Sequence, residues 1–125
     1  MIRVFIVDDH PLVIEGIHAL LKNEKDIAWV GQAMNAQSCI GFFVNNTADV
    51  VLMDISMPGM DGLELLKNIR GEKLVPTATV IMLTNQADDE EKAKALGVDG
   101  YIIKATTIPS EVVEKVLQVY KNKNK

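Results

Sequence analysis

Residues 50–62 of the chain read VVLMDISMPGMDG: an apolar run ends in a carboxylate and a turn rich in proline and glycine follows. Continuous apolar runs of this kind are typical of strands in parallel sheets, which are buried on both faces. If residues 50–53 form such a strand, Asp54 lies where that strand leaves the core. Open α/β sheets bind their ligands at this edge, so we expect the functional site there.

The composition is that of one globular domain. The chain has 125 residues, of which 48% are hydrophobic and 24% charged, with a net charge of −4. This length can bury a core, and the apolar runs are shorter than the roughly 18 residues that a membrane span needs. The first residues show no export signal, so we expect a cytoplasmic protein without membrane contact. Negative charge disfavours binding to a phosphate backbone, and we expect DNA contact only through another domain.

The single cysteine, Cys39, has no partner within the chain for a disulfide. One thiol also cannot build a zinc cluster, and this usage suits a reducing cytoplasm. We therefore expect Cys39 to be a small buried residue.

Five β-branched, apolar segments alternate with five segments of helical periodicity. This alternation predicts an α/β, flavodoxin-like, doubly wound sheet of five parallel strands in the order 2-1-3-4-5, with five helices. The predicted strands are residues 2–7, 27–33, 50–53, 79–83 and 100–103, and the predicted helices lie at about 11–21, 35–46, 62–70, 87–96 and 109–120.

Two segments late in the chain differ from the rest. The helix at 87–96 is apolar mainly through alanine, so it should be held loosely, and Gly97 suits its C-terminal cap. Residues 121–125 read KNKNK and have nothing to pack. We expect a domain of residues 1–121, with 122–125 a tail or the start of a linker.

The predicted strand order brings polar residues together. Asp8 and Asp9 follow the first strand and Asp54 follows its neighbour, while Thr84 and Lys104 follow the last two strands at the same edge. Three adjacent carboxylates repel one another, and an oxygen-seeking cation such as Mg²⁺ relieves this. A lysine and a hydroxyl suit a phosphoryl group, which a carboxylate such as Asp54 can accept directly as an acyl phosphate.

These residues, together with the MPGMDG turn at 57–62, resemble the receiver domain of bacterial two-component response regulators over nearly the whole chain. The resemblance implies a regulatory domain rather than an enzyme, phosphorylated on Asp54 by a sensor histidine kinase. It implies that Asp9 and Asp54 bind Mg²⁺ directly with the Ser56 carbonyl, and that Asp8 assists through water.

The resemblance also implies a switch. Thr84 and Lys104 would bind the phosphoryl group, and Tyr101 would be the aromatic residue that turns inward as Thr84 moves. The face of the fourth helix and fifth strand would then act on a partner or an appended domain. Homodimerisation would use this face or the first and last helices.

The DDHP sequence at 8–11 looks like that of LuxR/NarL-type receivers, which precede a DNA-binding helix-turn-helix domain. This similarity implies transcription as the output, through an appended domain. Many receivers have a proline after the lysine, in a cis bond, whereas this chain has Ala105, which puts a cis peptide in doubt.

Other interpretations stay open. A pseudo-receiver would act through protein contacts without phosphorylation. A Mg²⁺-dependent phosphatase is a weaker hypothesis, since no substrate pocket is evident in the sequence. A flavodoxin-like FMN binder is also weaker, since the three acids would repel the FMN phosphate. Gln86 would align or block the hydrolytic water. His10 and His18 are interpreted as structural, with His18 at the surface.

Overall fold

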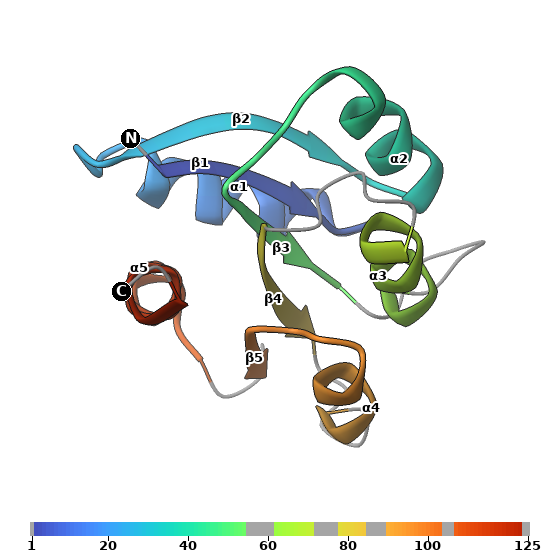
Figure 1. Cartoon of the computed structure of the whole chain (residues 1–125). Helices are drawn as coiled ribbons and strands as arrows, with labels where there is room; N and C mark the ends of the chain where they lie inside the picture. Colours follow the sequence, from blue (N-terminus) through green and yellow to red (C-terminus); the bar gives the residue numbers. More distant parts are fainter. Residues whose placement is uncertain (1, 55–61, 72–77, 85–89, 104–106, 124–125) are drawn as a thin grey trace.

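The computed structural model describes residues 2–54, 62–71, 78–84, 90–103 and 107–123. Within them a five-stranded, all-parallel sheet has the order β2-β1-β3-β4-β5, which confirms the predicted fold and strand order (Figure 1). The strands are β1 (Ile2–Val7), β2 (Ile27–Ala33), β3 (Val50–Met53), β4 (Thr79–Thr84) and β5 (Gly100–Ile103), and the helices are α1 (Pro11–Leu21), α2 (Ala36–Asn45), α3 (Gly62–Gly71), α4 (Glu90–Ala95) and α5 (Pro109–Lys123).

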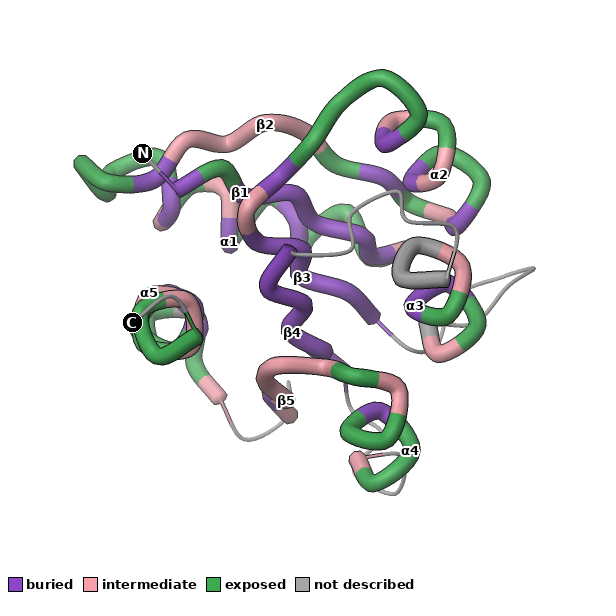
Figure 2. The backbone as a smooth tube through the Cα atoms, viewed as in Figure 1, coloured by how far each residue is buried: buried purple, intermediate pink, exposed green. Residues whose placement is uncertain are grey.

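The helices cover both faces of the sheet, and alternate residues of each central strand pack into separate cores. Val4 and Ile6 of β1 lie in the core beneath α1 and α5, whereas Phe5 and Val7 lie in the core beneath α2, α3 and α4. Every residue of β3 and β4 is buried (Figure 2). Burial on both faces explains why these strands read as continuous apolar runs.

A glycine in β2 allows aromatic rings to pack closely over the sheet. The pairing of β1 with β2 shifts between Val4 and Phe5, which face Trp29 and Gly31. The rings of Phe5 and Phe42 lie 4.4 Å apart between centroids. A Cβ on Gly31 would lie 3.0 Å from Phe5 and 3.2 Å from Phe42, so the glycine makes room for α2 to approach.

Helix α4 is attached by little apolar surface. Ala93 is its one buried residue among those described. Gly97 follows with φ of +91° and closes the helix end, as predicted. The Val98 N–H donates to the Ala93 carbonyl at 3.1 Å, and the Gly97 N–H to that of Lys94 at 3.1 Å. The predicted start of this helix at residue 87 lies outside the described residues.

The C-terminal helix continues further than the sequence suggested. Lys123 lies in α5, and its Nζ donates to the Ala78 carbonyl at 2.9 Å and to Asp99 Oδ2 at 3.0 Å. Asp99 Oδ2 also accepts the Val80 N–H at 2.9 Å. The expectation that residues 121–125 have nothing to pack is therefore wrong for Lys123. This residue is held by polar contacts, which an apolar pattern in the sequence does not reveal. None of the helices among the described residues has the length and apolarity to cross a membrane.

Cys39 is fully buried in α2, as predicted. Burial raises the pKa of its thiol from the ordinary 9.0 to about 12, because the apolar surroundings disfavour the thiolate. The neutral thiol of the folded protein is therefore protected from reagents that attack the thiolate.

Removing the Lys123 side chain should loosen the end of α5. Lys123→Ala is expected to lower the free energy of unfolding by about 0.5–1 kcal/mol, since the lost bonds are partly exposed to solvent. Lys121→Ala, at an exposed position of the same helix, is the control and should change it by less than about 0.5 kcal/mol. Urea unfolding measures both, and equal effects would show that the Lys123 contacts contribute nothing.

Cys39 should make stability depend on pH in the alkaline range. Its folded pKa is raised, so its contribution is full below pH 9.0 and is lost as pH rises towards about 12. Relative to Cys39→Ala, the free energy of unfolding should fall by up to about 1.4 kcal/mol per pH unit in this window. Urea unfolding of both proteins from pH 8 to 10.5 measures this, and parallel curves would contradict it.

Candidate functional site

Three carboxylates meet at the carboxyl end of β1 and β3. Val7 pairs with Met53 across these strands, so the residues that follow, Asp8 and Asp54, emerge side by side. The Asp54 N–H continues the β1–β3 hydrogen-bond ladder by donating to the Val7 carbonyl at 2.9 Å. The Asp8 N–H donates to the Ala33 carbonyl of β2 at 3.0 Å. The predicted convergence of these carboxylates is confirmed.

Burial differs among the three acids. The side chains of Asp8 and Asp54 are only 1% and 3% exposed, whereas that of Asp9 is 30% exposed. Charge interactions are stronger at buried positions than in water. The site therefore has two buried carboxylates and one that faces solvent.

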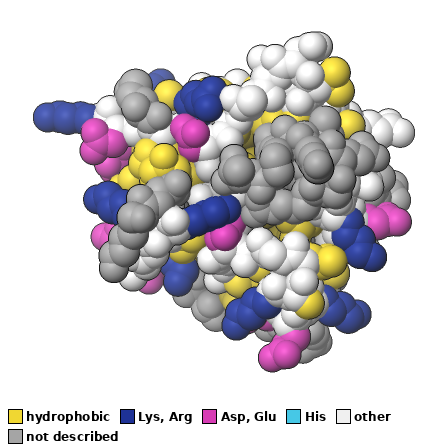
Figure 3. Space-filling view, in the orientation of Figure 1, with side chains coloured by type: hydrophobic (Ala, Val, Ile, Leu, Met, Phe, Trp, Pro, Cys, Tyr) yellow, Lys and Arg dark blue, Asp and Glu magenta, His cyan; other side chains and the backbone are white. Residues whose placement is uncertain are grey.

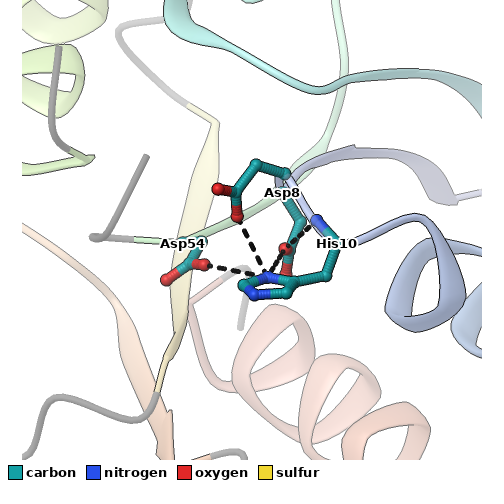
Figure 4. A network of polar contacts seen from close by, with 4 residues as sticks. Asp8, His10 and Asp54 are labelled. Carbon is teal, nitrogen blue, oxygen red and sulfur yellow. Dashed lines mark hydrogen bonds and ion pairs between the residues drawn. The ribbon is translucent and has the colours of Figure 1, made fainter. Parts of the chain in front are cut away.

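His10, which the sequence led us to expect as a structural residue, completes this group. Its Nδ1 lies 2.8 Å from Asp8 Oδ1, 3.0 Å from Asp9 Oδ1 and 3.8 Å from Asp54 Oδ2. Figure 4 shows its ring facing the carboxylates of Asp8 and Asp54.

The local backbone explains the position of His10. The residue precedes Pro11 and is extended, with φ of −106° and ψ of 101°, as residues before proline prefer. Its N–H donates to Asp8 Oδ1 at 2.9 Å. The signal in the sequence was the position of His10 between two aspartates and a proline that begins a helix. The other histidine, His18, stacks on Trp29 with ring centroids 4.2 Å apart, and is half-buried rather than at the surface.

The donor set fits a divalent cation. One ligand atom from each of Asp8, Asp9, His10 and Asp54 can be chosen so that all four lie within 4.8 Å of one another. Carboxylate oxygens are the protein ligands that Mg²⁺ prefers, and a cation offsets their mutual repulsion. Ser56, the predicted carbonyl ligand, lies outside the described residues.

The remaining predicted site residues lie in β4 and β5 or outside the described residues. Thr84 ends β4, is buried and pairs with Ile103 of β5. Tyr101 of β5 is half-buried and packs against the core that contains Ala93 of α4. The residues outside the described part of the chain are Lys104, Ala105 and Gln86.

An apolar groove of about 350 Å³ lies between α1 and α5. Leu83 and Thr107 line it towards the strand ends, and Leu12, which is 82% exposed, lines it on the α1 side. Leu12 follows His10 by two positions in the sequence, so the α1 side of the groove belongs to the same helix that begins after the site. No pattern in the sequence marks this groove, because it depends on how two distant helices pack.

Charged side chains of both signs are interspersed over the face of the molecule shown in Figure 3. A nucleic-acid-binding face would instead gather lysine and arginine into a patch or stripe.

A family model and several known proteins match nearly the whole chain. The family model of the response regulator receiver domain matches residues 4–117. The response regulator protein VraR of Staphylococcus saprophyticus is 37% identical over 98% of this chain and 58% of its own length. The response regulator UvrY of Escherichia coli K12 is 39% identical over 96% of this chain and 55% of its own.

Among solved structures, a LuxR-family two-component response regulator from Aurantimonas sp. SI85-9A1 superposes with a TM-score of 0.87 at 29% identity. The superposition covers 98% of this chain and 86% of the Aurantimonas chain. This chain spans little more than half the length of the two relatives named above, at 58% and 55%. From its residues 4–117 and its fold, the chain belongs to the receiver domain family of response regulators.

Proposed function

We propose that this domain accepts a phosphoryl group from a sensor histidine kinase on Asp54, with Mg²⁺, and so controls an output. The observation that carries the proposal is the buried Asp54 carboxylate at the end of β3, grouped with Asp8 and Asp9 from β1. The output is transcription, through an appended DNA-binding domain in the cytoplasm. Support for this comes from the LuxR-family regulator that the fold resembles.

The proposed transfer uses the Asp54 carboxylate as nucleophile. One of its oxygens attacks the phosphorus of a phosphohistidine, an O–P bond forms, the N–P bond breaks and the kinase imidazole leaves. Asp9, Asp54 and the Ser56 carbonyl would hold Mg²⁺, with Asp8 acting through water. The ion supplies charge neutralisation for the phosphoryl oxygens. The Thr84 hydroxyl and the Lys104 ammonium would bind those oxygens as well.

The proposed switch runs from Thr84 to the face formed by α4 and β5. Thr84 moves towards the added charge, and Tyr101 follows inward against the core that includes Ala93. The small buried surface of α4 supports this, since a loosely packed element shifts at low cost in free energy. Homodimerisation would use this face, or that of α1 and α5.

The apolar groove between α1 and α5 is the proposed contact for the kinase. A donor that brings phosphohistidine to Asp54 must also contact the surface around the site, and α1, which lines the groove, begins directly after His10. The 82% exposure of Leu12 leaves a large apolar side chain for such a partner.

Phosphorylation should depend on Asp54 and on Mg²⁺. With acetyl phosphate and Mg²⁺, intact mass should rise by one phosphoryl group, and EDTA should prevent the gain. Asp54→Asn should abolish it, because the amide is not a nucleophile of this kind. Asp49→Asn, immediately before β3 and paired with Arg3, is the control and should retain the gain in mass.

Two results would contradict this proposal. Full labelling of Asp54→Asn would show that another residue is the acceptor. A folded wild-type protein that neither gains mass nor responds to a beryllofluoride mimic would support the pseudo-receiver alternative.

Leu12 should matter for the kinase and not for a small donor. Leu12→Ala is expected to slow transfer from the cognate phosphorylated kinase about tenfold, the cost of losing a buried leucine contact. The cognate kinase is first identified by profiling transfer from a panel of sensor kinases. Val44→Ala on α2, where Val44 is 63% exposed, should leave transfer unchanged. A rate from acetyl phosphate that falls as much as the kinase rate would assign Leu12 to the site itself.

A further inference from the structure

We infer that His10 is a nitrogen ligand of the cation that the acidic site holds, and that it shifts the site's preference from Mg²⁺ towards ions such as Co²⁺ that favour imidazole. The inference rests on the proposed Mg²⁺ site and adds a residue to it. It concerns which divalent ion binds, and not whether phosphorylation occurs.

The distances around His10 are those of ligands that share one ion. Two atoms bound at right angles to a cation, each about 2.1 Å from it, are about 3.0 Å apart, and opposite atoms are about 4.2 Å apart. His10 Nδ1 is 2.8, 3.0 and 3.8 Å from the nearest oxygens of Asp8, Asp9 and Asp54. All three separations lie within or close to this range, so an ion between these atoms needs little movement of the side chains.

The backbone N–H of His10 is held by a hydrogen bond, while its imidazole ring stays accessible to solvent. Its N–H is held by Asp8 Oδ1 at 2.9 Å, and its side chain makes no capping bond to α1. The side chain is 59% exposed, whereas those of Asp8 and Asp54 are buried. A cation that approaches the two buried carboxylates from solvent therefore meets the ring of His10 on its way.

The same distances are also compatible with a simple hydrogen bond from the imidazole to Asp8. The two roles differ in their chemistry. An imidazole that only bonds the carboxylate is displaced by any cation, so its removal affects all ions alike. An imidazole that binds the ion favours metals late in the first transition row, which take nitrogen, over Mg²⁺, which takes oxygen.

Isothermal titration calorimetry with Mg²⁺ and with Co²⁺ separates these roles. His10→Ala should weaken Co²⁺ binding at least about 10- to 100-fold, the range found when residues that only hydrogen-bond to a metal ligand are lost, and should change Mg²⁺ binding less than about threefold. His18→Ala is the matched control and should change neither. His10→Gln, which keeps more of the side-chain volume, should behave like His10→Ala, and circular dichroism checks that each variant is folded.

A spectroscopic measurement gives a second readout. The visible absorption of bound Co²⁺ should differ between the wild type and His10→Ala, because a nitrogen ligand is replaced by oxygen. His18→Ala should give the wild-type spectrum.

Each contrary outcome has its own meaning. If the wild type binds both ions and His10→Ala weakens them equally, or weakens neither, His10 is not a ligand and the inference is wrong while the Mg²⁺ site stands. If the folded wild type binds neither ion, both the inference and the proposed Mg²⁺ site are wrong.

Discussion

Repulsion between carboxylates held at adjacent strand ends is the constraint on which this structure depends. Asp8 and Asp54 are buried and lie on neighbouring strands, where charges interact more strongly than in water. The fold cannot separate them, because the Asp54 N–H belongs to the same ladder of hydrogen bonds that joins β3 to β1. The site is therefore built to receive positive charge. A divalent cation is the partner that we propose for it.

The sheet can hold these charges because the rest of it is rigid and apolar. Two separate cores lie on its faces, and β1 contributes to both through alternate residues. The Phe5 ring anchors one face through its contacts with Phe42 and Phe43. Gly31 leaves room for this packing. The position of Asp8 at the end of β1 is thus fixed by residues that have no part in its chemistry.

The fold was predictable because its strands are apolar, β-branched segments that alternate with segments of helical periodicity. The bounds predicted for β1, β2, β3 and β5 agree with the structure. The central strands β1, β3 and β4 are buried on both faces, whereas the edge strands β2 and β5 are largely half-buried and show their apolar, β-branched residues less continuously. The convergence of Asp8, Asp9 and Asp54 followed from the strand order and one general rule about sheet edges. Both predictions rest on apolar patterns, which a sequence displays directly.

The misjudged residues are polar ones whose partners are distant or whose direction depends on the local backbone. His10 reaches the carboxylates because Pro11 keeps it extended. Lys123 finds the Ala78 carbonyl and Asp99 across the chain. No periodicity marks either residue, because one hydrogen bond or ion contact leaves no repeat. The groove beside Leu12 was missed for a related reason, since it belongs to the packing of α1 on α5.

The slight attachment of α4 has a consequence for how free energy is distributed across the domain. The backbone amides of β3 and β4 are enclosed between two cores and should exchange with solvent only when most of the protein unfolds. Those of α4, which is held at Ala93, can exchange through local opening. A rearrangement confined to α4 therefore draws on the small local free energy of opening and leaves the global stability nearly unchanged. The switch proposed above would therefore not require the domain to approach its unfolded state.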